Sequence, residues 1–130
     1  MLDTNILVSA LLNARSVPAQ VFNLVQNDQV QAYSDVRILD EYRSVLLRPK
    51  FGFARSLVDG ALFHFEEFIV SPPPLTESLP DEDDHPFLEV ALHVEAGYLV
   101  TGNLAHFPKE KCAPVKPISP REFLDIFRNS

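Results

Sequence analysis

The chain has 130 residues, a single cysteine and a formal net charge of -7. A chain of this length forms one domain of ordinary size that needs no disulfide or structural metal to fold, and we predict one domain over residues 1–130. The single cysteine excludes an internal disulfide, and no apolar stretch approaches the roughly 20 residues of a membrane span. We therefore expect a soluble, cytoplasmic protein without membrane contact, and the acidic charge argues against wrapping nucleic acid with a broadly basic surface.

Hydrophobic periodicity and turn signals predict alternating helices and strands. Helices are predicted over residues 6–12, 19–26, 36–47 and 55–68, from Asp84 to an end at Gly97, and after a capping box that begins at Ser119. Strands are predicted over residues 29–33, 98–101 and 115–118, and the proline-rich residues 71–80 are predicted to form a loop. Such alternation is typical of an α/β fold with a mainly parallel sheet covered on both faces.

The opening stretch MLDTNILVSALL contains three polar residues within an apolar sequence. Asp, Thr and Asn are unfavourable in a buried strand, whereas all three are favourable helix N-caps. Residues 3–5 therefore either begin the first helix or present a functional carboxylate, and this stretch alone leaves both interpretations open. Only Met1 and Leu2 precede Asp3, so the first strand is either short or truncated, and we expect it to hold Asp3 loosely.

Polar residues follow each of three expected strands. They are Asp3 and Asn5, then Ser34 and Asp35, then Thr101, Gly102 and Asn103. Because the carboxyl ends of parallel strands meet at one edge of a sheet, we expect these groups to lie close together. Two helices bring further acids to this edge, namely one of the neighbours Asp40 and Glu41, and the acidic residues 81–84, which include Asp81 and Asp84.

Carboxylates held within about 4 to 6 Å of one another repel unless a cation joins them. Oxygen ligands suit Mg²⁺ or Mn²⁺, and such an ion activates water and stabilises charge on a phosphodiester. The acidic pocket therefore indicates phosphodiester hydrolysis. The simpler interpretations are a solvated acidic loop for residues 81–84, a solvated helix acid for Glu41 and a turn residue for Asn103. The four histidines share no ligand spacing, and we interpret them as structural or surface residues.

Four stretches resemble, in order, the landmarks of PIN-domain proteins, and most closely the VapC-like toxins of type II toxin–antitoxin pairs. They are LDTNILVSALL, SDVRILDEYRSVLLRPKF, LPDEDDHPFLEVALHVEAGYLVTGN and ISPREFL. The resemblance covers nearly the whole chain and implies a PIN-like three-layer α/β/α sandwich with a mainly parallel central sheet. It also implies a Mg²⁺- or Mn²⁺-dependent endoribonuclease, whose partners are RNA, a cognate antitoxin protein and a second copy in a homodimer.

The resemblance assigns roles to individual residues. The family's first three acids carry over to Asp3, Glu41 and Asp84, as catalytic residues and metal ligands. The fourth catalytic position falls on Asn103, where many relatives carry aspartate, and this departure removes one charge that Asp81 or Asp83 would replace. The supporting residues are Asn5, Thr101 and Asp81, and the residues expected to contact RNA phosphates are Arg43, Arg48 and Lys50.

Two further functions fit these residues. The first is a PIN-like module that binds RNA or a partner with little or no cleavage, because Asn103 weakens the metal site. The second is a phosphohydrolase that uses Asp3 as a nucleophile, which is disfavoured because Asn5 replaces the second aspartate usual in such enzymes. Cleavage of RNA, binding of RNA without cleavage and hydrolysis of a generic phosphate ester distinguish the three functions.

Overall fold

The computed structural model describes residues 1–76 and 78–130, and Glu77 lies outside the described residues. The helices are α1 (Thr4–Leu12), α2 (Val17–Gln26), α3 (Val36–Leu46), α4 (Arg55–Glu66), α5 (His85–His93), α6 (Lys109–Cys112) and α7 (Pro120–Arg128), and the strands are β1 (Tyr98–Val100) and β2 (Lys116–Ile118). Short 3₁₀ helices occupy Pro49–Phe51, Glu82–Asp84 and Leu104–His106. Apart from Glu77, the predicted loop at residues 71–80 contains neither helix nor strand.

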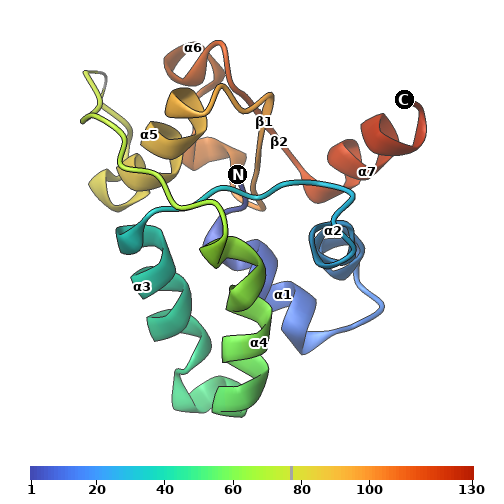
Figure 1. Cartoon of the computed structure of the whole chain (residues 1–130). Helices are drawn as coiled ribbons and strands as arrows, with labels where there is room; N and C mark the ends of the chain where they lie inside the picture. The colour runs from blue at the N-terminus through green and yellow to red at the C-terminus, as the bar shows by residue number, and fades with distance from the viewer. Residues whose placement is uncertain (77) are drawn as a thin grey trace.

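The sheet is parallel. β1 pairs with β2, with Val100 opposite Ile118, and Leu2 forms a parallel bridge to Val100 on the other edge of β1. α5 and α7 both contact β1, and Figure 1 shows helices on both sides of the strands. The expected α/β architecture is therefore confirmed, and the carboxyl ends of these parallel segments meet at one edge, where Asp3 and Thr101 follow.

The helices pack through buried aromatic residues. α1 packs against α2 and α3, and α3 and α4 form a hairpin that extends away from the sheet (Figure 1). Tyr42 of α3 is fully buried, and its ring centroid lies 5.2 Å from that of Phe65 in α4 and 6.2 Å from that of Phe87 in α5. Contacts of this kind stabilise the fold through area burial and ring geometry, and here they fix α3 between two other helices.

Side chains cap four helices as the sequence predicts. Asp3, Ser16 and Asp35 each accept a hydrogen bond from a backbone amide in the first turn of the helix that follows, and Ser119 with Glu122 forms a complete capping box. Each such cap contributes about 1 kcal/mol by satisfying an amide that has no partner within the helix. None of the helices in the described residues has the length and apolar character of a membrane span.

The prediction of a strand over residues 29–33 is wrong. Within the part of the chain that the structure describes, only Ser34 pairs there, through a single bridge to Ile69, and the amides of residues 31–33 make no hydrogen bond to other backbone. Met1 and Leu2 pair with β1 instead, and both they and residues 30–33 line a cavity of about 160 Å³. The alternating sequence of this segment favours an extended backbone, but a strand also requires a neighbour that the fold does not place there.

The predicted end of the fifth helix at Gly97 is also wrong. α5 ends at His93, and Glu95 adopts the left-handed conformation with a φ of 54°. The Ala96 amide donates to the Ala91 carbonyl over 2.9 Å, and the Glu95 amide donates to the Leu92 carbonyl over 3.2 Å. These two bonds form a Schellman motif, which usually places glycine at the position that Glu95 occupies.

Candidate metal centre

Asp3 lies where the first extended segment meets α1. Its Oδ1 accepts a hydrogen bond from the Thr4 amide over 2.8 Å, and its Oδ2 accepts one from Thr101 Oγ1 over 2.7 Å. The residue is only 7 % exposed. Asp3 therefore caps α1 and also presents a buried carboxylate at the sheet edge, so the two interpretations of the opening stretch are compatible. Each carboxylate oxygen retains a second lone pair for another ligand.

Glu41 reaches the same edge from α3. Thr4 Oγ1 donates a hydrogen bond to Glu41 Oε2, so Thr4 contacts both Glu41 and Asp3. The buried hydroxyl of the neighbouring Tyr42 donates a hydrogen bond to the Leu2 carbonyl over 2.5 Å. This bond fastens α3 to the segment that carries Asp3, and it thereby sets the position of Glu41 beside Asp3.

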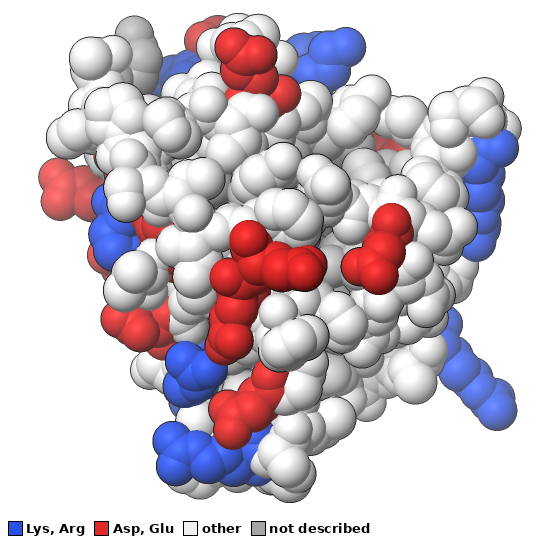
Figure 2. All heavy atoms as spheres, viewed as in Figure 1, with Lys and Arg blue, Asp and Glu red and all other residues white. Residues whose placement is uncertain are grey.

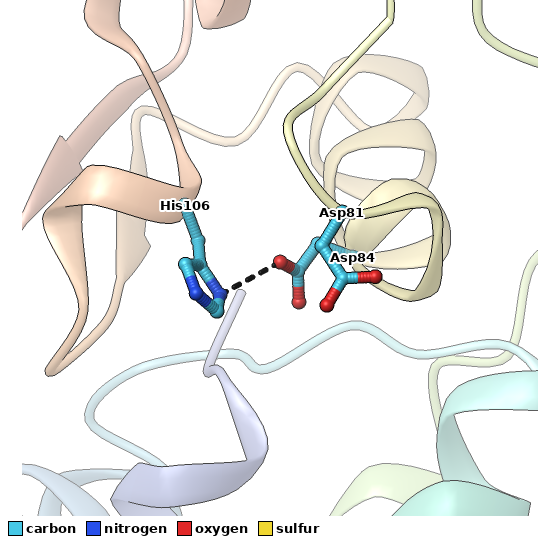
Figure 3. Close-up of side chains that lie close together, drawn as sticks. All are labelled: Asp81, Asp84 and His106. Carbon is cyan, nitrogen blue, oxygen red and sulfur yellow. Dashed lines mark ion pairs between the residues drawn. The ribbon is translucent and has the colours of Figure 1, made fainter.

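Asp84 enters from the 3₁₀ helix that precedes α5. Its Oδ2 is buried and accepts no hydrogen bond from the described residues, although His106 Nδ1 lies 3.0 Å away. Figure 3 shows Asp81, Asp84 and His106 directed toward one another from two separate segments. One ligand atom from each of these three residues lies within 4.8 Å of the others.

Burial raises the pKa values of the three predicted metal ligands, and the negative charge of Asp3 raises those of Glu41 and Asp84 further. The pKa of Asp84 rises to about 6, mainly because burial disfavours its charged form and then because Asp3 is negatively charged. Burial also raises the pKa of Asp3, despite the two hydrogen bonds that oppose this shift. The pKa of Glu41 rises through burial, with a smaller contribution from the charge of Asp3. A divalent cation would relieve these unfavourable charges.

The residues fit a divalent metal ion. The donors are mainly carboxylate oxygens, which suit Mg²⁺ and Mn²⁺, and Asp84 Oδ2 is a buried acceptor that lacks a hydrogen-bond donor. Within the described residues, the group of ligand atoms closer than 4.8 Å includes Asp84 but neither Asp3 nor Glu41. The charge of Asp3 thus acts on both Glu41 and Asp84, and the ligand atoms of Asp84 group most tightly with a carboxylate, Asp81, and an imidazole, His106.

The two predicted supporting residues outside this group differ in position. Thr101 is fully buried and lies in direct contact with Asp3, while Asn5 is exposed on the first turn of α1. Asn103 is half-buried, and its backbone amide donates to Thr101 Oγ1 over 3.0 Å. Asn103 thus lies two residues after Thr101, and it contacts Thr101 through its backbone amide.

The three basic residues predicted to bind RNA have different surroundings. Arg43 faces α4 and pairs with Asp59 and Glu66 over 3.7 and 3.6 Å. Lys50 lies over the Phe51 ring, with 5.1 Å between its Nζ and the ring centroid. Arg48 is exposed at the end of α3, and its positive charge acts to lower the pKa of Glu41. Figure 2 shows basic side chains at the lower end of the α3–α4 hairpin, with acidic ones in the middle of the same face.

His106 is the site residue that sequence reasoning missed. We interpreted all four histidines as structural or surface residues, because no ligand spacing relates them to one another. His106 is nevertheless half-exposed, and its imidazole contacts Asp84. The available signal was its place three residues after Asn103, in the segment that follows β1 at the functional edge of the sheet.

The PIN domain family matches residues 1–105, which is most of the chain. The chain therefore belongs to the PIN domain family, whose members share a nuclease-type fold and are generally metal-dependent nucleases. The uncharacterized protein MJ1680 of Methanocaldococcus jannaschii is 26 % identical to it over 140 aligned residues, which include 98 % of this chain and 90 % of that protein. No solved structure matches the chain significantly.

Proposed function

We propose that this protein is a Mg²⁺- or Mn²⁺-dependent endoribonuclease, with Asp3, Glu41 and Asp84 as its catalytic metal ligands. The observation that supports this most strongly is the convergence of three acids from distant parts of the chain. Thr4 bonds to both Asp3 and Glu41, while Asp84 contributes a buried oxygen without a hydrogen-bond donor. Membership of the PIN domain family supports the same class of activity.

The surrounding residues position these carboxylates. Thr101 holds one oxygen of Asp3, and Tyr42 fastens α3 so that Glu41 remains beside Asp3. Arg48 provides an exposed positive charge near Glu41, where an RNA phosphate would approach. When bound, the divalent ion would supply an activated water and would stabilise the negative charge that develops on the phosphodiester.

The geometry disfavours Asp3 as the nucleophile of a phosphohydrolase. Both of its carboxylate oxygens accept short hydrogen bonds, and the residue is almost fully buried. A nucleophile must approach the phosphorus atom directly, whereas a metal ligand needs only a free lone pair. The contacts of Asp3 therefore fit a metal ligand whose position is fixed by hydrogen bonds, and they do not fit a nucleophile.

The second candidate function is a PIN-like module that binds RNA or a protein partner with weak or no cleavage. Two observations favour it. Asn103 contributes no negative charge where many relatives carry an acid, and the ligand atoms of Asp3 and Glu41 lie outside the tightest group around Asp84. The two candidates differ in whether bound RNA is cut.

Cleavage of a mixed pool of end-labelled RNAs tests the proposed activity, with Mg²⁺, Mn²⁺ or EDTA in the reaction. We expect the wild type to cleave RNA only with metal. Asp84→Asn should lower the cleavage rate by more than about 100-fold, which exceeds the loss typical of changing a residue that only hydrogen-bonds to a metal ligand. The matched control is Asp125→Asn on the exposed face of α7, which makes the same charge change away from the site. RNA that binds but stays intact under all conditions would favour the binding module instead.

We further propose that the ribonuclease is the toxin of a toxin–antitoxin pair and acts in the cytoplasm. The support is the resemblance of its motifs to the toxin branch of the family. Induced expression in a bacterial host should arrest growth for the wild type but not for Asp84→Asn, and co-expression of a small neighbouring reading frame that encodes the antitoxin should restore growth. Light scattering on the purified protein tests the homodimer that the resemblance implies.

A further inference from the structure

His106 and Asp81 form a group with Asp84, and neither of these two residues belongs to the three acids of the proposed nuclease site. His106 lies in the 3₁₀ helix Leu104–His106, and the two acids border the 3₁₀ helix Glu82–Asp84. Their side chains point toward one another across the gap between these segments (Figure 3). The group contains a nitrogen donor as well as carboxylates, so it differs in chemistry from an ordinary acidic surface cluster.

The distance between His106 and Asp84 suits two ligands of one metal ion. In an octahedral site with bonds of about 2.1 Å, neighbouring ligand atoms lie about 3.0 Å apart and opposite ones about 4.2 Å apart. His106 Nδ1 and Asp84 Oδ2 lie 3.0 Å apart, and the Asp81 ligand atom completes a group whose members are all within 4.8 Å. Asp81 is exposed, so its carboxylate has freedom to approach the other two atoms.

The contact between His106 and Asp84 brings a nitrogen and a buried oxygen together. The two atoms form an ion pair when the imidazole is protonated, and Asp84 Oδ2 has no hydrogen-bond partner among the described residues. For neighbouring ligands of an octahedral ion, the nitrogen lone pair points at the ion, about 45° away from the line to the adjacent oxygen. The short contact between His106 Nδ1 and Asp84 Oδ2 therefore fits two neighbouring ligands of one ion when the imidazole is neutral.

We propose that His106, Asp84 and Asp81 bind a first-row transition metal ion such as Mn²⁺ or Co²⁺ in preference to Mg²⁺. This inference rests on the proposed function in one respect, since Asp84 belongs to both sets of ligands. Imidazole nitrogen is a common ligand of transition metals, whereas Mg²⁺ prefers oxygen. The nitrogen of His106 also supplies a donor near Asn103, where the chain lacks the acid of many relatives.

Pulsed electron paramagnetic resonance of bound Mn²⁺ tests the nitrogen ligand directly. The protein is purified without a histidine tag and kept in excess over Mn²⁺ in an imidazole-free buffer. We expect coupling of Mn²⁺ to a ¹⁴N nucleus in the wild type and its loss in His106→Gln, which retains Mn²⁺ through the carboxylates. The matched control is His93→Gln, because His93 is exposed at the end of α5 and outside the group, and it should keep the coupling.

Calorimetry supplies the second measurement. His106→Gln should lower the affinity for Co²⁺ by at least about 10-fold and leave the affinity for Mg²⁺ unchanged. Bound Mn²⁺ without ¹⁴N coupling in the wild type, no binding of Mn²⁺, or an unchanged Co²⁺ affinity in His106→Gln would each overturn the inference. RNA cleavage by the same samples distinguishes the two proposals. Cleavage without nitrogen coupling would overturn only the proposed His106 site, and coupling without cleavage would overturn only the proposed ribonuclease activity.

Discussion

Asp84 combines burial with the negative charges of several neighbours, and its pKa rises from an ordinary value of 3.8 to about 6. A carboxyl group whose pKa is higher in the folded state stabilises the fold only while the folded protein holds the proton. Its contribution is therefore fully present below about pH 4 and is lost as the pH rises through about 6. At neutral pH the ionised group favours either unfolding or the binding of a cation.

We predict that Asp84→Asn stabilises the metal-free protein at pH 7. The amide keeps the shape of the side chain and removes its charge, so the free energy of unfolding should rise by about 1 kcal/mol, a value reduced from the full shift because the site is partly open to solvent. The difference from the wild type should shrink between about pH 6 and pH 4. Urea denaturation in EDTA at several pH values measures both effects, and a variant less stable than the wild type at pH 7 would contradict this account.

Single residues of the site differ in how far the sequence predicts them. Asp3 is recognisable because polar residues interrupt an apolar stretch, and the structure shows the cap and the buried carboxylate together. Thr101 is recognisable because it follows a strand, and it contacts Asp3. His106 is not, because its contact with Asp84 joins two loops that no helix or strand periodicity relates.

Among the elements, α3 and α5 are connected by a partly buried charge network. Arg37 contacts Asp35 over 2.6 Å and Glu89 over 2.7 Å, and both carboxylate side chains are only 6 % exposed. Glu89 also accepts a hydrogen bond from the Leu75 amide over 2.8 Å. The network thus connects the start of α3, the middle of α5 and the proline-rich loop. It therefore stabilises α3, which carries Glu41, and α5, which begins directly after Asp84.

We predict that Arg37→Ala lowers the free energy of unfolding by about 2 kcal/mol, since it leaves two buried carboxylates without their cation and Arg37 itself is half-exposed. The matched control is Arg43→Ala, whose pairs with Asp59 and Glu66 are longer and more exposed, and it should cost less than about 1 kcal/mol. Chemical denaturation of both variants at pH 7 gives the comparison. Equal losses would show that the network has no special role.

Helices were more predictable than strands because their determinants are local. The caps at Ser16, Asp35 and Ser119 and the apolar periodicity lie within each helix, and most predicted boundaries agree with the structure within two residues. A strand depends on a distant neighbour, so residues 29–33 have a strand-like pattern but no strand. The end of α5 was misplaced because Glu95 occupies a position that glycine usually takes.

For the whole molecule, the charge distribution limits how the protein could bind the proposed RNA substrate. The formal net charge is -7, and basic side chains on the face in Figure 2 lie at its margins, including the lower end of the α3–α4 hairpin, with acidic ones in the middle. Long-range attraction of the proposed RNA substrate would therefore be weak, and its affinity would depend on a few local phosphate contacts. Arg48 is the best placed of the predicted contacts, because Arg43 already pairs with α4 and Lys50 lies over Phe51.

We predict that Arg48→Ala weakens RNA binding about equally for different sequences and reduces the slope of log affinity against log salt concentration by about 1. Arg43→Ala should have a smaller effect because of its pairs within the protein. Fluorescence anisotropy with short labelled RNAs at several salt concentrations measures both. An unchanged slope in Arg48→Ala would place this residue on a solvated helix face instead.

Calorimetric titration of Mg²⁺ into the wild type, Asp3→Asn and Asn103→Asp tests the carboxylate metal centre most directly. Mg²⁺ prefers oxygen ligands, so its binding reports on Asp3, Glu41 and Asp84 with little contribution from His106. We predict that the wild type binds Mg²⁺, that Asp3→Asn loses this binding, and that Asn103→Asp binds more tightly because it adds a carboxylate two residues after Thr101, in the segment that follows β1. Equal Mg²⁺ affinity in Asp3→Asn and the wild type would contradict the metal centre.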